Sequence, residues 1–290
     1  MYPSRFAYDA PSSLEEAIAI LDAGGGEAKI LAGGQSLIPM LKLRFAAPER
    51  LVDINSLPGL DYHRVDPDGT LRIGALCRHE DLEFSDKLEA FPTLAQAAAL
   101  VADPIVRTRG TFVGSVCHAD PQGDWAATMI ALDGTIVAQG PNGRREIPMS
   151  DFVLGPFVNA LAYNEIAVEA VIPAAKGTAC GGYLKLERRV GDFATASVAV
   201  ALDMDGDTVR RAGCALAGVG GRTIDANDAI SVLVGKTLTD ENIAAAAQAV
   251  AAAAEPRTDH RGSADYKRHI VETFVSRILT NISRSEQKAA

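Results

Sequence analysis

The sequence predicts an α+β protein of two domains, and three observations support this. The chain has 290 residues, 48% of them hydrophobic, which is enough for two compact cores. Residues 173–178 follow a predicted strand and collect proline, glycine and small residues, as a domain boundary does. Beyond this boundary the pattern changes to three successive strands followed by helices, which is typical of an α+β domain.

The part before the boundary alternates between short strands and short helices. A helix begins at Ser12 or Ser13, either of which can cap it, and residues 24–26, all glycine, end it. Residues 106–124 mix small and polar residues with little helical periodicity, so we expect a loop there. Hydrophobic patterns predict strands at 29–32, 50–54, 70–75, 135–138, 145–148 and 165–172, and helices at 79–82, 91–102 and 125–132.

The part after the boundary predicts a three-stranded antiparallel sheet with helices. Residues 182–189, 197–204 and 208–217 have strand patterns, and residues 205–207 (Asp-Gly-Asp) form a hairpin turn signal. Two helices follow at 240–254 and 264–282. The expected domains are therefore 1–175, with subdomains of about 1–57 and 58–175, and 176–290.

Charge and composition exclude several classes of protein. The net charge of −9 argues against nucleic-acid binding, because phosphate backbones are held by an excess of Lys and Arg. The sequence lacks a signal peptide and any run of about 18 apolar residues, so we expect a cytoplasmic protein without a membrane span. Its four cysteines form no C-x-x-C pair, so we expect no iron–sulfur or zinc site in this chain.

The first candidate binding motif is Gly33-Gly34-Gln35-Ser36, which follows a predicted strand. Such a loop can turn several backbone N–H groups toward one phosphate, and glycines without Cβ atoms let that phosphate approach. The motif is neither a Walker A loop nor the G-x-G-x-x-G of a dinucleotide-binding fold. Taken alone, it is better explained as a turn at the end of a strand.

The second candidate is the segment from Thr111 to Asp124, which again combines glycine and hydroxyl residues. It can supply a second wall of donors around the same diphosphate, with Arg107 and Arg109 offsetting its charge. Two such loops in one acidic domain are better explained by an adenine dinucleotide than by coincidence.

Other polar and aromatic residues have a structural and a functional interpretation. We favour a loop-organising hydrogen bond over a general base for His118, and surface positions over metal ligands for His79, His260 and His269. Lys185, Glu187 and Arg189 share one strand face, which is either solvated or in contact with a partner or an anionic ligand. Phe193 is either a flavin cover or core, whereas Trp125 is expected to pack in the core.

Four separated motifs in order closely resemble the medium, FAD-binding subunit of molybdenum hydroxylases. This family includes aerobic carbon monoxide dehydrogenase and is similar to the flavin domain of xanthine dehydrogenase. The motifs, which together cover nearly the whole chain, lie at residues 32–44, 109–121, 185–194 and 261–267.

The resemblance implies an FAD-binding domain of the p-cresol methylhydroxylase type with two subdomains, followed by the C-terminal domain. FAD would lie between the domains, with its diphosphate on residues 32–36 and 111–115, Lys185 near the pyrimidine end of the isoalloxazine and Phe193 near the ring. No side chain need act as a catalytic acid or base. The implied FAD-binding residues are Leu31, Ala32, Gly33, Gly34, Gln35, Ser36, Leu37, Thr111, Gly114, Ser115, His118, Asp124, Leu161, Lys185 and Phe193.

The resemblance also implies partners. A large subunit would carry the molybdopterin cofactor and a small subunit two-iron two-sulfur clusters, in a dimer of heterotrimers, and this FAD would pass their electrons to an external acceptor. The alternatives are a self-contained FAD-dependent reductase of the same fold and a non-catalytic assembly subunit.

Two residues depart from the family pattern. Val113 stands where the family usually has glycine, which favours Thr111, Gly114 and Ser115 as contacts. Gln35 stands where carbon monoxide dehydrogenases commonly have His, so the substrate need not be carbon monoxide.

Overall fold

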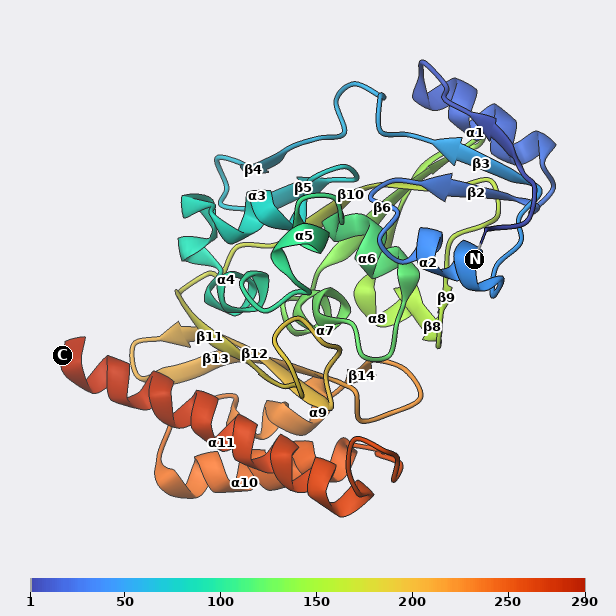
Figure 1. Cartoon of the computed structure of the whole chain (residues 1–290). Coiled ribbons are helices and arrows are strands. Elements are labelled where there is room, and N and C mark those ends of the chain that lie inside the picture. The colour runs from blue at the N-terminus through green and yellow to red at the C-terminus, as the bar shows by residue number, and fades with distance from the viewer. Residues whose placement is uncertain (1, 290) are drawn as a thin grey trace.

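The computed structural model describes residues 2–289 and the side chains up to residue 285. It is an α+β structure in which two small sheets and their helices lie on one side of a third sheet, and two long helices lie on the other side (Figure 1). No helix within the described residues is long and apolar enough to cross a membrane.

The first sheet is parallel and holds the N-terminal segment. Its strand order is β1-β3-β2, and the predicted cap is confirmed, because the Ser13 side chain accepts a hydrogen bond from the backbone N–H of Glu16. Ala17, Ile18 and Leu21 are buried on the inner face of the helix that follows. The elements are β1 (Ala7–Asp9), α1 (Leu14–Ala23), β2 (Ala28–Leu31), α2 (Leu37–Leu43) and β3 (Arg50–Asp53).

The second sheet is antiparallel, with strand order β4-β5-β10-β6-β7. Its strands are β4 (His63–Val65), β5 (Leu71–Gly74), β6 (Thr135–Gly140), β7 (Gly143–Pro148) and β10 (Ile166–Ile172). The segments between them form α3 (His79–Glu83), η1 (Asp86–Ala90), α4 (Pro92–Ala98), α5 (Pro104–Arg107), α6 (Phe112–His118), α7 (Asp124–Ala131), α8 (Met149–Phe152), β8 (Val153–Gly155) and β9 (Val158–Asn159).

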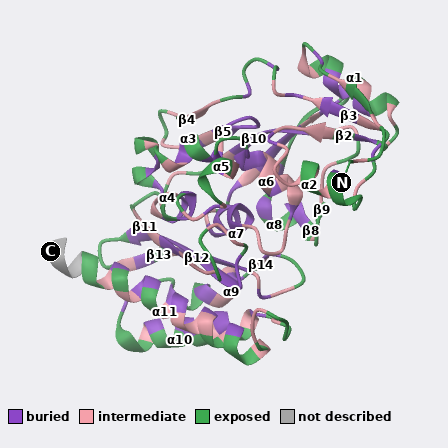
Figure 2. Ribbon diagram, in the orientation of Figure 1, coloured by how far each residue is buried: buried purple, intermediate pink, exposed green. Residues whose placement is uncertain are grey.

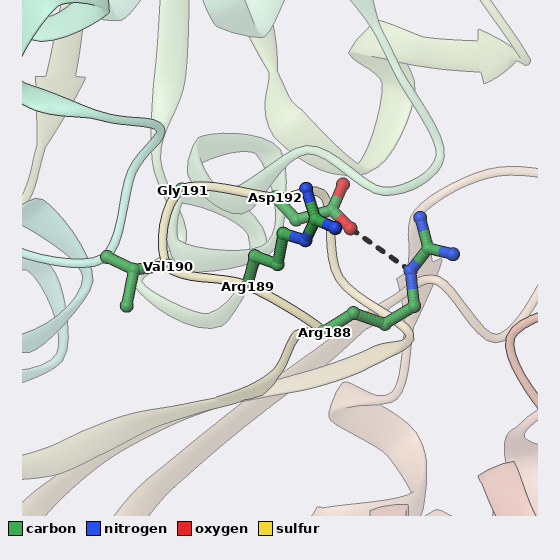
Figure 3. A pocket seen from close by; sticks show the side chains of 5 residues that line it. All are labelled: Arg188, Arg189, Val190, Gly191 and Asp192. Atoms are coloured by element: carbon green, nitrogen blue, oxygen red, sulfur yellow. Dashed lines mark hydrogen bonds and ion pairs between the residues drawn. The ribbon is translucent and has the colours of Figure 1, made fainter.

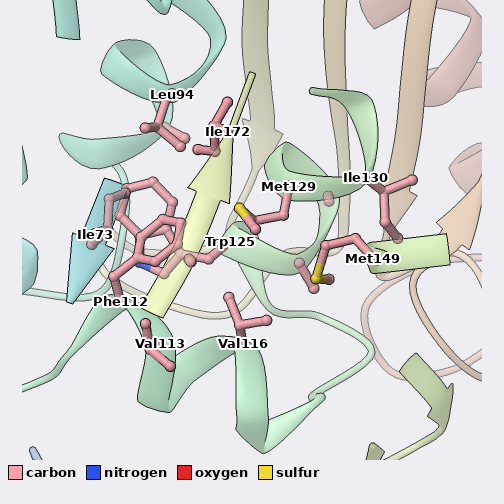
Figure 4. Packing of buried hydrophobic residues seen from close by; sticks show 14 of the residues in the cluster. Ile73, Leu94, Phe112, Val113, Val116, Trp125, Met129, Ile130, Met149 and Ile172 are labelled. Atoms are coloured by element: carbon pink, nitrogen blue, oxygen red, sulfur yellow. The ribbon is translucent and has the colours of Figure 1, made fainter. Parts of the chain in front are cut away.

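Two predictions for this region are wrong. The helix expected over 91–102 ends at Ala98, and Ala102 has a φ of +52°, which a helix does not allow. The segment expected to be a loop over 106–124 contains α6. Trp125 is fully buried as predicted, and its ring lies 4.7 Å from that of Phe112 at the centre of the core (Figure 4).

The third sheet is antiparallel, in the order β11-β12-β13-β14, so the predicted three strands are joined by a two-residue fourth strand. Along β12, Val198 and Val200 pack toward α10 and α11, whereas Ala199 and Ala201 pack toward the core that contains α4 and α7. Both faces of this sheet are therefore buried (Figure 2). The elements are β11 (Thr178–Leu186), β12 (Ala196–Asp205), β13 (Thr208–Ala217), β14 (Ile224–Asp225), α9 (Asn227–Ile230), η2 (Ser231–Leu233), α10 (Asp240–Ala253) and α11 (Ala264–Ala289).

Candidate functional site

A cleft of about 780 Å³ brings the sequence-predicted site residues together. Its volume is within the usual range for small-molecule and cofactor sites. Leu31 is the one predicted residue that does not line it. The residues that do are Ala32, Gly33, Gly34, Gln35, Ser36, Leu37, Thr111, Gly114, Ser115, His118, Asp124, Leu161, Lys185 and Phe193.

Gly33 brings the two glycine-containing motifs into contact. A Cβ atom built on Gly33 would lie 2.4 Å from the carbonyl oxygen of Arg109 and 2.7 Å from the Cα of Gly110. The missing Cβ at this position therefore makes room for the backbone of the second motif, whereas the sequence analysis had attributed it to an approaching phosphate. Gly34 has a φ of +73°, a conformation that favours glycine.

The turn through these glycines leaves donors available to a ligand. Within residues 2–289, no group accepts a hydrogen bond from the backbone N–H of Gly33, Gly34 or Gln35. Ser36 precedes α2 without using its side chain as a cap. Successive backbone N–H groups without partners in a turn can bind an anion.

The second motif begins a helix. Thr111 caps α6, because its hydroxyl accepts a hydrogen bond of 3.2 Å from the N–H of Gly114. Phe112, Val113 and Val116 are buried on one face of this helix, and Figure 4 shows Val113 and Val116 beside Trp125. The opposite face of the helix carries small residues, so the spacing of the buried residues is a weak helical signal in the sequence.

The backbone N–H of Val113 is still available as a donor, although Val113 stands where the family usually has glycine. The N–H of Phe112 is bonded to the carbonyl oxygen of Cys77 at 3.0 Å, and the N–H of Gly114 to Thr111. Val113 lies between them in the first helical turn, where N–H groups have no partner within the helix. Its side chain is buried in the core, so only its backbone is directed toward a ligand in the cleft.

Asn55 and Arg78 connect the two motifs, and the sequence analysis missed both. The amide of Asn55 donates to the carbonyl oxygen of Ala32 at 2.9 Å. The guanidinium of Arg78 donates to Asn55 Oδ1 at 2.8 Å and to the carbonyl oxygen of Arg109 at 2.6 Å. As single polar residues after strands, they carry no local signal of this role.

Arg107 was expected to offset the charge of a diphosphate, but it contacts other parts of the protein instead. Its guanidinium is bonded to Glu83 at 2.6 Å and to the carbonyl oxygens of Val101 and Ala102 at 3.0 Å each. It is buried, and its charge is paired with that of Glu83 and not with a phosphate. Arg109 is exposed.

Lys185 is buried in the wall of the cleft, so the interpretation of its strand face as solvated is wrong. Its side chain is 1% exposed, and its ammonium donates to the carbonyl oxygen of Leu100 at 2.8 Å and lies 3.3 Å from carboxylate oxygens of both Asp124 and Glu187. Arg189 does not share this face, because β11 ends at Leu186. It belongs to the loop over 187–193, part of which is seen in Figure 3.

Asp124 and Tyr183 complete this buried group. Asp124 is the first residue of α7, and its carboxylate accepts a hydrogen bond of 2.5 Å from the phenol of Tyr183 in β11. Burial raises the pKa of Asp124, and Lys185 opposes that rise. Burial also raises the pKa of Tyr183 well above its usual value, so this phenol is the donor.

His260 and His269 are exposed as predicted, whereas His118 and His79 differ from their predicted roles. The His118 side chain makes no hydrogen bond within the described residues, and its ring lies 5.1 Å from that of Phe157. His79 is buried, not on the surface, and its Nδ1 accepts a hydrogen bond from Trp125 Nε1 at 3.0 Å. No group of three or more His, Cys, Asp or Glu side chains within the described residues could hold a metal ion.

The remaining predicted residues lie at the edge of the cleft. The N–H of Leu161 donates to Asn159 Oδ1 at 2.9 Å, and the Asn159 amide donates to the carbonyl oxygen of Cys117 at 2.6 Å. Phe193 is 46% exposed, so it is not a core residue.

Comparison with known proteins identifies the family. Residues 4–175 match the FAD binding domain in molybdopterin dehydrogenase, and residues 182–282 match the CO dehydrogenase flavoprotein C-terminal domain. The chain belongs to this flavoprotein family. It is thus an FAD-binding subunit of the molybdenum hydroxylase type, and the resemblance inferred from the four motifs is confirmed.

Relatives align over almost the whole chain. It is 45% identical to the carbon monoxide dehydrogenase medium chain of Hydrogenophaga pseudoflava, over 96% of this chain and 97% of that protein. It is 38% identical to subunit alpha of the 6-hydroxypseudooxynicotine dehydrogenase complex of Paenarthrobacter nicotinovorans, over 96% and 95%. A solved structure of carbon monoxide dehydrogenase from Hydrogenophaga pseudoflava matches with a TM-score of 0.93 and 44% identity, over 99% of both chains.

The cofactor of this flavoprotein is FAD, and the cleft suits it. The open N–H groups of Gly33, Gly34 and Gln35 are of the kind that can donate to a diphosphate. The same cleft reaches Lys185 and Phe193, which offer a cation and an aromatic ring. When bound, FAD supplies the redox chemistry, and the chain supplies binding and orientation.

Proposed function

We propose that the cleft holds the FAD diphosphate between residues 32–36 and 111–115. The observation that carries this proposal is that a turn with open backbone N–H groups contacts the backbone at the capped start of α6. Arg78 and Asn55 would keep the two walls of this site at a fixed separation.

The isoalloxazine would lie toward Lys185, Asp124 and Phe193, with His118 and Leu161 at its edges. All five residues line the cleft, and the ammonium of Lys185 places a positive charge in its wall. The chain's own task would be to bind FAD and expose one ring face, without a side chain that acts as acid or base.

The domain division that we propose is 1–175 and 176–290, with subdomains of about 1–57 and 58–175 in a p-cresol methylhydroxylase-type arrangement. The parallel sheet lies wholly within 1–57 and the five-stranded antiparallel sheet within 58–175, which supports the division.

This FAD would receive electrons from iron–sulfur clusters of a small subunit, after a large molybdopterin-binding subunit has oxidised the substrate, and pass them to an external acceptor. The names of the relatives, a medium chain and a complex subunit, support a hetero-oligomer, for which we propose a dimer of heterotrimers. We place this complex in the cytoplasm, since Cys77 and Cys214 are buried thiols, as expected in a reducing compartment.

The test is flavin uptake by the purified full-length chain, measured by visible absorbance after FAD addition and removal of free FAD. We expect stoichiometric flavin. Lack of any bound flavin would refute the proposal and favour the assembly-subunit alternative. Copurification from the native host then separates the remaining alternatives, because a fully active single chain would contradict the complex and favour a self-contained reductase.

A further inference from the structure

The fourth motif, residues 261–267, lies outside the lining of the FAD cleft, yet its first residue is directed toward it. Arg261 lies between α10 and α11, and its side chain is only 10% exposed. Its Nη1 donates to the carbonyl oxygen of Phe193 at 2.7 Å, and its Nη2 lies 3.3 Å from Asp192 Oδ1. Arg261 thus binds the loop that contains Asp192 and Phe193, about 70 residues earlier in the sequence.

A buried lysine holds Arg261 in this position. Asp259 Oδ1 accepts hydrogen bonds from the N–H groups of Arg261 and Gly262, at 2.8 and 3.3 Å. Lys267 of α11 is 2% exposed, and its ammonium donates to Asp259 Oδ2 at 2.7 Å and to the carbonyl oxygen of Arg257 at 3.2 Å. The turn that presents Arg261 is therefore anchored to a long helix.

The loop that Arg261 holds, residues 187–193, forms one edge of the cleft. Gly191 and Asp192 line both the FAD cleft and an adjoining hollow of about 590 Å³. Figure 3 shows that Val190 points away from Asp192, and it is 91% exposed. With so little of its own side-chain surface buried, the tip of this loop depends on contacts made at Gly191, Asp192 and Phe193.

We propose that Arg261 is a positioning residue, which fixes the loop over 187–193 and thereby places the Phe193 ring over the isoalloxazine end of FAD. The proposal rests on the FAD site described above. It assigns the fourth motif a role in flavin binding through its contacts with Asp192 and Phe193, at the end of the cleft away from the proposed diphosphate site.

The first test does not depend on FAD. Trypsin cleaves after arginine, and the exposed loop offers Arg188 and Arg189. In the full-length chain, Arg261→Gln should raise the rate of cleavage at these two sites about tenfold, since a charge-assisted hydrogen bond is lost. Arg261→Lys should restore part of the protection, and Arg210→Gln, which breaks the ion pairs of Arg210 with Asp205 and Asp203 in the same half of the chain, should change nothing.

A variant on the loop keeps this test decisive if Arg261→Gln fails to fold. Asp192→Asn removes the same ion pair from a partly exposed position, together with the exposed pair between Asp192 and Arg188, and should raise cleavage at least as much. In the Asp192→Asn background, Arg261→Gln should raise cleavage by less than it does in the wild type, because the two substitutions share the Arg261–Asp192 pair. Unchanged cleavage in a folded Arg261→Gln or in Asp192→Asn would overturn the proposal.

The second test separates positioning from general damage. Arg261→Gln should weaken FAD binding about tenfold and reduce the visible circular dichroism of bound flavin. Binding of 5′-ADP, measured by competition, should be unchanged, because the diphosphate site lies elsewhere in the cleft. Equal weakening of FAD and ADP, or no change in either, would refute the role. If the wild-type chain takes up no FAD, the proposed function fails, while the cleavage test still decides whether Arg261 holds the loop.

Discussion

The phenol of Tyr183 donates a 2.5 Å hydrogen bond to the carboxylate of Asp124, and both side chains are buried. This bond joins the first residue of α7 to the middle of β11, where the third sheet meets the core of the FAD-binding part. Lys185, two residues along β11, lies against the other carboxylate oxygen. One buried polar group therefore connects the two parts of the chain and forms a wall of the cleft.

Replacing Tyr183 with Phe should lower the free energy of unfolding by about 2 kcal/mol, because a buried carboxylate loses a hydrogen bond. Urea unfolding followed by circular dichroism measures the loss. Tyr8→Phe is the matched control, since Tyr8 also donates to a carboxylate, that of Asp53 at 2.7 Å, but is exposed. A loss in Tyr183→Phe no larger than in Tyr8→Phe would contradict a stabilising role for the buried bond.

Gly33→Ala should separate the two motifs. The added Cβ would lie 2.4 Å from a backbone oxygen, which cannot move as a flexible side chain can, so we expect a cost of about 1–3 kcal/mol and weaker FAD binding. Thermal unfolding and FAD titration measure the two effects. Gly221→Ala, where a Cβ meets nothing within 4 Å, should leave both unchanged. Normal stability in Gly33→Ala would mean that the close approach is not needed.

Gly34→Val should abolish FAD retention. Gly34 has a φ of +73°, which a β-branched residue adopts only at a cost of about 1–3 kcal/mol, so the turn that exposes the N–H groups should change. Gly206→Val is the control, because Gly206 has a φ of +62° in the hairpin between β12 and β13, away from the cleft. Flavin content after gel filtration should fall only in Gly34→Val. Full flavin content in that variant would show that the diphosphate is placed wrongly.

The sequence predicts features of this fold that depend on neighbouring residues. The alternation over 197–217 and the turn at 205–207 specify the β12–β13 hairpin, and Ser13 specifies the start of α1. The start of α6 was missed because Gly114 and Ser115 lower the helical signal, whereas its buried face is clear only in the folded core.

The candidate site was predicted as a set of residues but not as a set of contacts. The motifs locate Gly33 and Thr111, yet the reason that Gly33 is a glycine is the backbone of Arg109, 76 positions later. The charge of Arg107 suggested a phosphate ligand, whereas the structure gives it Glu83. Such pairings depend on how separate segments pack, and no local pattern encodes them.

The pH dependence of stability should reveal the buried His79. Burial, and then the charges of Arg107 and Arg78, lower the pKa of His79 to about 4 from an ordinary value of 6.5. Protonation of Nδ1 would also remove the acceptor of the Trp125 hydrogen bond. Above about pH 6.5, His79 is neutral in both states and contributes no pH dependence. As the pH falls toward 4, only the unfolded chain binds the proton, so stability decreases.

His79→Gln isolates this contribution, because an amide oxygen can still accept from Trp125 but does not titrate. Between about pH 7 and pH 5, the wild type should lose about 2 kcal/mol more of its free energy of unfolding than the variant does. Urea unfolding at each pH gives both curves, and their difference cancels the titration of other groups, including His63 and His118, whose pKa values burial also lowers. Parallel curves would mean that His79 is protonated at no cost in the folded chain, and that its bond to Trp125 does not hold it neutral.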